Sequence, residues 1–226
     1  MEITPRMRVI IDFADRAEVA ADIGCDHGFV AVALATENKA KYVFACDISE
    51  KSLRKTRKLV QECGISNVEP VLSEGLLALK GKTVDCIVIA GMGGMLIRDI
   101  LMAGLDDVRG ERRLVLAPQS NEAELRKYLY EIGYHITDEA IVLDDGHYYQ
   151  IIAASEGKKA MPEEVYLHFG YYPIVRKDKV QKEFLQRKLC EYEKIIVSAA
   201  GGKDTQEYVA KKSELRNRIE EVLRCL

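Results

Sequence analysis

The segment from Val19 to Phe29 constrains the fold more than any other part of this 226-residue chain. It begins as a short apolar strand, reaches an acid at Asp22, and then turns at Gly24-Cys-Asp-His-Gly28 into a segment rich in helix formers. Glycines lack a Cβ, so the backbone there can bend sharply and come close to a ligand. A strand, a glycine turn and a helix in this order predict an α/β fold with a ligand at the turn.

The residues of this turn also indicate which ligand it prefers. A second apolar strand, Tyr42–Cys46, is followed by Asp47, and an acid at this place holds ribose hydroxyls in α/β folds. The dinucleotide pattern G-x-G-x-x-G is absent, because Asp26 and Phe29 stand where its second and third glycines would be. A carboxylate at Asp26 would repel a pyrophosphate, which disfavours a nicotinamide oxidoreductase. S-adenosyl-L-methionine has two cationic groups and no phosphate, so it is the expected cofactor.

Composition and cysteine spacing exclude several other classes. The hydrophobic content of 48% and charged content of 31% are typical of a soluble globular protein. No apolar run approaches the roughly 18 residues that span a bilayer, so no membrane association is expected. Arg6, Arg8 and Asp12 interrupt the first apolar stretch, so we expect no signal peptide and a cytoplasmic location. None of the six cysteines forms C-x-x-C, and no metal site is expected.

Strand and helix patterns alternate over residues 1–155 and predict a Rossmann-like α/β sheet that ends in an antiparallel hairpin. Seven strands with a terminal hairpin resemble the sheet of the class I methyltransferases. The expected strands are Val19–Ile23, Tyr42–Cys46, Asn67–Leu72, Val84–Ile89, Arg113–Ala117, His135–Leu143 and Tyr148–Ala154. The expected helices are Thr4–Asp15, Phe29–Glu37, Glu50–Cys63, Met95–Gly104 and Glu122–Glu131, with N-caps at Ser49 and Asn121 and stops at Gly64 and Gly133.

The segment 156–226 has a different character. Its apolar residues recur at spacings of three and four, which predicts a coiled-coil-like helical hairpin with a break at 200–205. It carries 15 Lys and Arg against 12 Asp and Glu, whereas the first 155 residues carry 18 against 24. A basic appendage on an acidic domain suggests contact with a polyanion. Packing on the sheet and dimerisation are the alternatives; we expect a monomer, with a homodimer through the hairpin as the other possibility. The seam residues are Leu185, Leu189, Tyr192, Ile196 and Ala199, and Leu215, Ile219, Val222 and Leu226.

A second glycine-rich turn, Ala90-Gly-Met-Gly-Gly94, follows the strand Val84–Ile89. Its glycines would let a methyl donor and an incoming base approach closely; the alternative is a structural turn with Met92 in the core. The chain has no Asp/Asn-Pro-Pro-aromatic motif, as methylation of an exocyclic amine generally uses, and no Cys beside a Pro, as carbon methylation would need. A ring nitrogen of adenine is nucleophilic in the neutral base, so its methylation needs positioning more than a strong base.

These motifs together resemble the TrmK family, bacterial methyltransferases that modify N1 of the adenine at position 22 of tRNA. The resemblance runs nearly end to end and rests on Asp22-Ile-Gly-Cys-Asp-His-Gly28, Ala90-Gly-Met-Gly-Gly94, Leu116-Ala-Pro-Gln-Ser-Asn121 and Tyr148-Tyr. It departs from the family at Cys25, where Thr is expected. It implies S-adenosyl-L-methionine as cofactor, tRNA as substrate, a methyltransferase domain over 1–155 and a tRNA-binding hairpin over 156–226.

The resemblance also implies roles for individual residues. Met92 and Gly93 would flank the methyl donor and target base, and the amides of Gln119 and Asn121 would pair with the adenine edge. Arg6 and Arg8 would contact tRNA phosphates; for these arginines and amides, surface or capping duty is the alternative. A small-molecule or protein methyltransferase and a non-catalytic RNA-binding module remain as other functions. The expected cofactor-binding residues are Asp22, Gly24, Asp26, His27, Gly28, Asp47, Ile48, Ser73, Glu74, Gly75 and Gly91.

Overall fold

The computed structural model describes residues 2–199 and 206–226. The chain forms two compact units, Met1–Met161 and Pro162–Leu226. The first unit holds all of the described strands, and the second is helical. The predicted break at 200–205 and the side chain of the seam residue Ala199 lie outside the described part of the chain.

The sheet has the strand order β3-β2-β1-β4-β5-β7-β6, so the predicted seven-stranded sheet is confirmed. Strands β3, β2, β1, β4 and β5 are parallel, and β7 runs antiparallel to both β5 and β6. The chain fills the β2 and β3 side first and then crosses to β4, so the carboxyl ends of β1 and β4 form a switch point where such sheets bind ligands. The strands are β1 Ala17–Ile23, β2 Ala40–Asp47, β3 Val68–Leu72, β4 Cys86–Ala90, β5 Arg113–Ala117, β6 Tyr134–Asp144 and β7 His147–Glu156.

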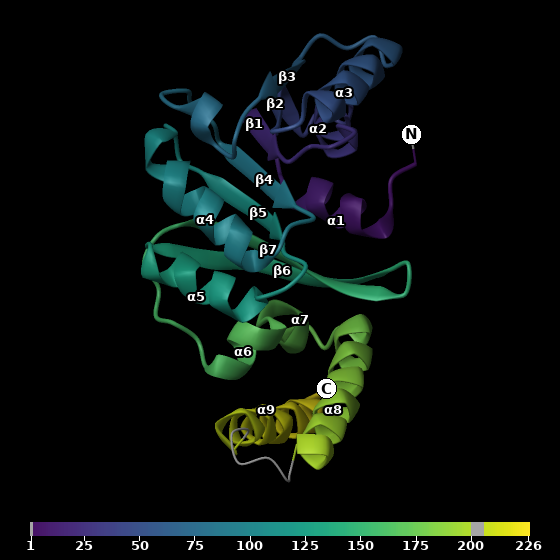
Figure 1. Cartoon of the computed structure of the whole chain (residues 1–226), viewed down its shortest axis with the longest axis vertical. Helices are drawn as coiled ribbons and strands as arrows, with labels where there is room; N and C mark the ends of the chain where they lie inside the picture. The colour runs from purple at the N-terminus through teal and green to yellow at the C-terminus, as the bar shows by residue number, and fades with distance from the viewer. Residues whose placement is uncertain (1, 200–205) are drawn as a thin grey trace. The chain divides into compact units, whose positions relative to one another are not determined.

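Five α-helices of the first unit cover the two faces of the sheet, with α1 to α3 on one face and α4 and α5 on the other (Figure 1). Each predicted helix forms within two residues of its expected ends. Two short 3-10 turns, η1 Leu77–Leu79 and η2 Leu105–Asp107, follow β3 and α4. The helices are α1 Pro5–Phe13, α2 Phe29–Thr36, α3 Glu50–Glu62, α4 Gly94–Gly104 and α5 Glu122–Glu131.

Helix α2 explains why the segment after the first glycine turn is apolar on every side. It lies between α1 and α3 and against β2, and its residues Ala31–Ala35 are all buried. A helix that is apolar all round belongs in a core, and its small alanines let the neighbouring helices come close. The burial of α2 fixes the position of the turn that precedes it, which lies at the carboxyl end of β1.

The predicted helix ends are mostly confirmed. The Ser49 hydroxyl caps α3 by accepting a hydrogen bond from Ser52 N at 3.3 Å. Gly64 and Gly133 follow their helices with φ of 65° and 84°, the left-handed conformation that ends a helix at low cost. Asn121 stands at the N-cap position of α5, but its side chain makes no capping bond. Its φ of 56° is left-handed, whereas a capping side chain reaches the helix from an extended backbone.

The second unit contains the predicted pair of long helices, which pack against each other (Figure 1). Leu185 and Tyr192 of the first are buried, as are Leu215 and Ile219 of the second. The Gln181 amide donates to the Phe169 carbonyl at 2.7 Å and ties the first long helix to a preceding short one. No helix among the described residues is both long enough and apolar enough to cross a membrane. The helices are α6 Glu164–Phe169, α7 Tyr172–Val175, α8 Lys179–Ala199 and α9 Gln206–Cys225.

Candidate active site

The turn between β1 and α2 is bound to the end of β2 by backbone and carboxylate hydrogen bonds. The backbone N–H groups of Gly24 and Cys25 both donate to the Cys46 carbonyl, at 2.8 and 3.0 Å. The Asp47 carboxylate accepts from Asp26 N at 3.0 Å with one oxygen and from Ser49 N at 2.8 Å with the other. Asp26 and Asp47, both singled out in the sequence, therefore lie beside each other, and main-chain donors orient the Asp47 carboxylate.

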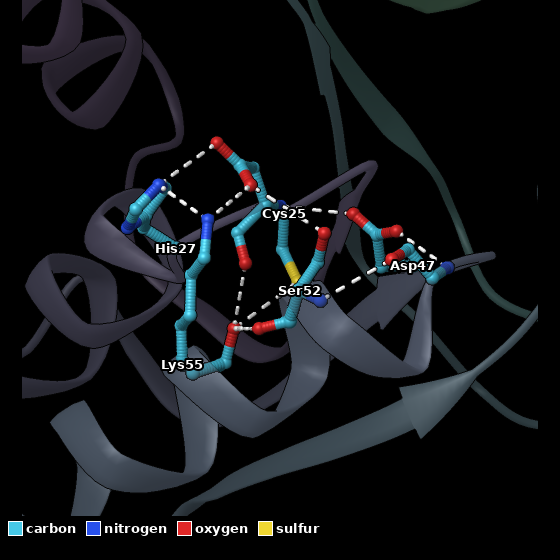
Figure 2. Close-up of polar contacts among 8 residues, drawn as sticks. Cys25, His27, Asp47, Ser52 and Lys55 are labelled. Atoms are coloured by element: carbon cyan, nitrogen blue, oxygen red, sulfur yellow. Dashed lines mark hydrogen bonds and ion pairs between the residues drawn. The ribbon is translucent and has the colours of Figure 1, made fainter.

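Side chains of helix α3 also contact this turn (Figure 2). The Thr56 hydroxyl donates to the Asp26 carbonyl at 3.0 Å, and the Ser52 hydroxyl donates to the Asp26 carboxylate at 3.4 Å. The Lys55 ammonium lies 3.0 Å from His27 Nε2 and 3.8 Å from Asp26 Oδ1. These contacts hold Asp26 at a φ of 44°, a left-handed conformation that few residues other than glycine adopt. Backbone strain held by its surroundings is common at functional sites.

Asp22 is a buried acid near the carboxyl end of β1, just before the turn. Its carboxylate accepts a hydrogen bond from Ala31 N in the first turn of α2 at 3.2 Å. Burial raises the pKa of the Asp22 carboxyl from 3.8 to about 7, the Ala31 bond lowers it, and the charge of Asp47 raises it further. Asp22 therefore titrates near neutral pH beside the ligand turn.

A first cavity of about 450 Å³ opens at the carboxyl ends of β1, β2 and β3. Its polar lining includes the carboxylates of Asp47, Glu74 and Asp99, and among the described residues that line it none is Lys, Arg or His. Three apolar side chains that are more than half exposed, Ile48 at 72%, Leu77 at 54% and Leu96 at 53%, also line it. Of these carboxylates, Asp99 is paired with Arg98 at 2.7 Å, whereas Asp47 and Glu74 have no ion pair among the described residues. Acidic groups beside apolar walls suit a cationic ligand with a flat ring and oppose a phosphate.

A second cavity, of about 320 Å³, has the lining residue Gly24 in common with the first. Its lining includes Asp22, Asp26, His27 and Gly91. The His27 ring is stacked on the ring of Phe29, with centroids 5.4 Å apart and an angle of 15° between the planes. The second cavity therefore combines carboxylates with aromatic rings, on which a planar base can stack.

The predicted site residues divide between the two cavities. The first is lined by Gly24, Asp47, Ile48, Ser73, Glu74, Gly75 and Met92, and the second by Arg6, Asp22, Gly24, Asp26, His27 and Gly91. Gly28 lines neither cavity. A Cβ there would lie 2.5 Å from Thr56 Cγ2, so this glycine allows α3 to pack closely against the turn. Arg8 lines neither cavity, since its guanidinium donates to both carboxylate oxygens of Glu37, at 2.6 and 2.9 Å.

The second glycine turn and the segment after β5 are joined through their backbones. Gln119 N donates to the Met92 carbonyl at 2.9 Å, and Gly94 N donates to the Ser120 carbonyl at 2.7 Å. A Cβ on Gly94 would lie 2.5 Å from the Asn121 carbonyl, so only glycine fits there. Gly93, Gln119 and Asn121 line neither cavity, and the two amide side chains are exposed. Their proposed contact with a base stays a prediction.

Sequence reasoning missed several residues around the cavities. Ser52, Lys55 and Thr56 hold the turn, but only the packing of α3 against it brings them there. On α4, Leu96, Ile100 and Ala103 line the first cavity, and their spacing of four and three was a readable signal of one helix face. Tyr149 supports the Arg6 guanidinium, which lies 4.4 Å from the centre of its ring.

Cysteine and metal chemistry gain no support from the described residues. Burial raises the pKa of the Cys25 thiol far above its ordinary value, and the charge of Asp22 adds to the effect. A thiol that stays protonated is a poor nucleophile. Among the described residues, no cluster of His, Cys, Asp or Glu could hold a metal ion.

Comparison with known proteins gives concordant results. The sequence model of a methyltransferase domain matches residues 3–152. The tRNA (adenine(22)-N(1))-methyltransferase of Bacillus subtilis is 30% identical over 230 residues, which cover 97% of this chain and 95% of that protein. The crystal structure of the B. subtilis enzyme, TrmK, superimposes with a TM-score of 0.86 at 27% identity and covers 98% of this chain and 99% of that one.

A further solved structure is that of a putative tRNA (m1A22) methyltransferase of Streptococcus pneumoniae in complex with S-adenosyl-L-methionine. It has a TM-score of 0.85 and 26% identity, and covers 98% of this chain and all of that one. The family match, the end-to-end relative and these structures agree with one another and with the α/β fold of the first unit. The chain therefore belongs to the TrmK family of class I methyltransferases.

Proposed function

We propose that this protein transfers a methyl group from S-adenosyl-L-methionine to N1 of an adenine in tRNA, at position 22 as in its B. subtilis relative. The observation that carries the proposal is the pair of cavities that share the lining residue Gly24, one acidic and apolar and the other aromatic and acidic. Methyl transfer needs two ligands with adjoining reactive ends, and a single glycine between two cavities provides that arrangement.

The residues present fit the cofactor. When bound, S-adenosyl-L-methionine supplies a methyl group on a sulfonium, whose electron pair stays on sulfur after transfer. Asp47 has both oxygens oriented by backbone donors and would hold the ribose hydroxyls. Ile48, Leu77 and Leu96 would cover the adenine ring. Gly24 has a φ of 72°, and a Cβ there would collide with Met92 Cε, so only glycine fits at this point of the site.

The second cavity would take the target base. His27 and Phe29 offer stacked rings for a base that has left its own stack. The N1 lone pair of adenine forms the new bond, and the ring becomes positively charged. The Asp26 carboxylate, which lines this cavity, would then accept a hydrogen bond from the exocyclic amine and stabilise that charge. Positioning and charge stabilisation are sufficient, since no proton must leave N1.

The segment 156–226, which contains the helical unit Pro162–Leu226, would supply further tRNA contacts, because it carries more Lys and Arg than Asp and Glu. We also propose a cytoplasmic location, where tRNA is modified in bacteria. A monomer is proposed as the working state, and gel filtration with light scattering would test it.

The direct test is methyl transfer to unmodified tRNA, followed by nucleoside mass spectrometry of the digest. The expected product is 1-methyladenosine, which is absent when adenine 22 is replaced. Cofactor binding without transfer to any tRNA would overturn the proposal. Methylation of a small molecule or protein would then favour the other enzyme class, and tRNA binding without transfer would favour a non-catalytic module.

A further inference from the structure

Helix α3 carries a concentrated positive charge that the sequence motifs did not single out. Five of its thirteen residues are Lys or Arg and only two are Glu. The residues Lys51, Arg54, Lys55 and Lys58 follow the spacing i, i+3, i+4, i+7 and therefore share one face, here called the α3 basic stripe. The opposite face buries Leu53 and Thr56 against the core. The stripe is exposed, and it lies on a segment, 1–155, with more acidic than basic residues.

Most of the charge of the stripe is available to a ligand. Lys51 and Arg54 make no ion pair with any residue that the structure describes. Lys58 lies 3.7 Å from Glu62, and both side chains are more than half exposed, so water screens that pair strongly. The fifth basic residue, Arg57, lies outside the stripe and donates to the Glu50 carboxylate.

The stripe is connected directly to the second cavity through Lys55. The Lys55 ammonium contacts His27 Nε2 at 3.0 Å and Asp26 Oδ1 at 3.8 Å, and both of those residues line the cavity (Figure 2). From Lys51 to Lys58 the helix rises about 10 Å, since each residue adds about 1.5 Å. In double-stranded DNA each strand advances about 3.4 Å along the helix axis per phosphate, so the stripe spans at most about three consecutive phosphates.

We propose that the α3 basic stripe binds the phosphates of the RNA strand that delivers the target base to the second cavity. This inference rests on the proposed function and assigns it a second surface, separate from the helical hairpin. Cationic side chains in a row neutralise a phosphate backbone without recognising its sequence. Lys55 is the residue of the stripe that contacts the lining of the second cavity, where the RNA backbone would deliver the target base.

The test compares two triple variants that each remove three positive charges. The first is Lys51→Ala, Arg54→Ala and Lys58→Ala, which spares Lys55 because of its contacts with the turn. The control is Lys41→Ala, Lys80→Ala and Lys127→Ala, at exposed lysines paired with acids elsewhere in the first unit. Unmodified tRNA is titrated at several salt concentrations, and cofactor affinity and turnover are measured alongside.

The stripe variant should bind tRNA about 10-fold more weakly than the control near 100 mM salt and should reduce the slope of log affinity against log salt by about two. Its KM for tRNA should rise, while kcat and cofactor affinity stay within about two-fold. Equal tRNA binding by the two variants would overturn the inference and leave the proposed function intact. If the stripe variant lost binding to phosphatidylserine vesicles but not to tRNA, the inference would also be overturned. Absence of tRNA turnover by the wild-type protein would instead refute the proposed function.

Discussion

Gly94 lies so close to Asn121 that a Cβ on the glycine would stand 2.5 Å from the asparagine carbonyl oxygen. Backbone bonds from Gly94 N to Ser120 O and from Gln119 N to Met92 O continue the contact on both sides. Two turns that follow neighbouring strands, β4 and β5, are thus held together by main-chain hydrogen bonds.

Gly94→Ala should therefore separate the two turns. Backbone oxygens cannot give way as a flexible side chain can, so we expect a loss of about 1–3 kcal/mol in the free energy of unfolding. Turnover should fall at least 10-fold while cofactor affinity changes little, since Gly94 lines neither cavity. Chemical denaturation, calorimetric titration and a methyl-transfer assay measure the three quantities.

Gly81→Ala is the matched control for this substitution, because Gly81 has nothing within 4 Å of an added Cβ. Its φ of 73° makes the change strained, so it should cost stability without slowing turnover. If both variants lose turnover in proportion to stability, the contact between the turns has no catalytic effect.

Asp26→Asn should keep the turn and remove its charge, because asparagine tolerates the left-handed backbone observed at this position. We expect kcat to fall roughly 10- to 100-fold, with a smaller change in KM for tRNA, since the carboxylate acts mainly on the cationic product-like ring. Single-turnover kinetics separates the chemical step from binding. Asp145→Asn, at an exposed hairpin residue with a φ of 47°, is the control and should leave kcat unchanged. An unaffected chemical step in Asp26→Asn would remove Asp26 from the mechanism.

The raised pKa of Asp22 predicts a pH-dependent stability of known sign. Between about pH 4 and pH 7 the folded protein holds a proton on Asp22 that the unfolded chain releases. The stabilisation from this group is complete below that window and is lost as the pH rises through it, by about 1.4 kcal/mol per pH unit at most. Denaturation of the wild type and of Asp22→Asn at several pH values should show the variant gaining relative stability as the pH rises. A difference that does not change with pH would contradict the assignment.

Arg6 and Arg8 were both expected to contact tRNA, and the structure gives them different surroundings. Arg6 stacks on Tyr149 and lines the second cavity, whereas Arg8 is engaged by Glu37. Arg6→Ala should raise the KM for tRNA about 10-fold, and Arg8→Ala should change it less than about three-fold. Arg6→Lys tests the stacking, because lysine keeps the charge and loses the planar group. A larger effect from Arg8→Ala would reverse the assignment.

The cysteines should divide into two groups by reactivity. Burial raises the pKa of Cys46 and of Cys86 to about 12, and that of Cys25 still further. Cys63, Cys190 and Cys225 are exposed. Brief treatment of the folded protein with iodoacetamide should modify only the exposed group, because the thiolate is the reactive form. Peptide mass spectrometry would identify the modified cysteines. Modification at Cys25 would contradict a buried, protonated thiol there.

Local sequence patterns predicted the fold and the main-chain frame of the site well. Gly24 and Asp26 follow β1, Asp47 is the last residue of the adjacent parallel strand β2, and the carboxyl ends of such strands lie at the same edge of the sheet. Lys55 and Thr56 could not be found in this way, since they reach the turn only because α3 packs back against it. The conformation of Asn121 was also missed: its backbone is left-handed, with a φ of 56°, and its carbonyl oxygen lies against Gly94.

Among the residues that the structure describes, Gly24 alone lines both cavities. A ligand that joined an adenosine in the first cavity to a base in the second would pass this glycine and the Met92 side chain, whose Cε lies 2.1 Å from the place of a Cβ on Gly24. Linking the halves would convert the second binding event into an intramolecular one and raise the overall affinity without any new contact. Because Gly24 lines both cavities, a change at this residue alters both binding sites at once.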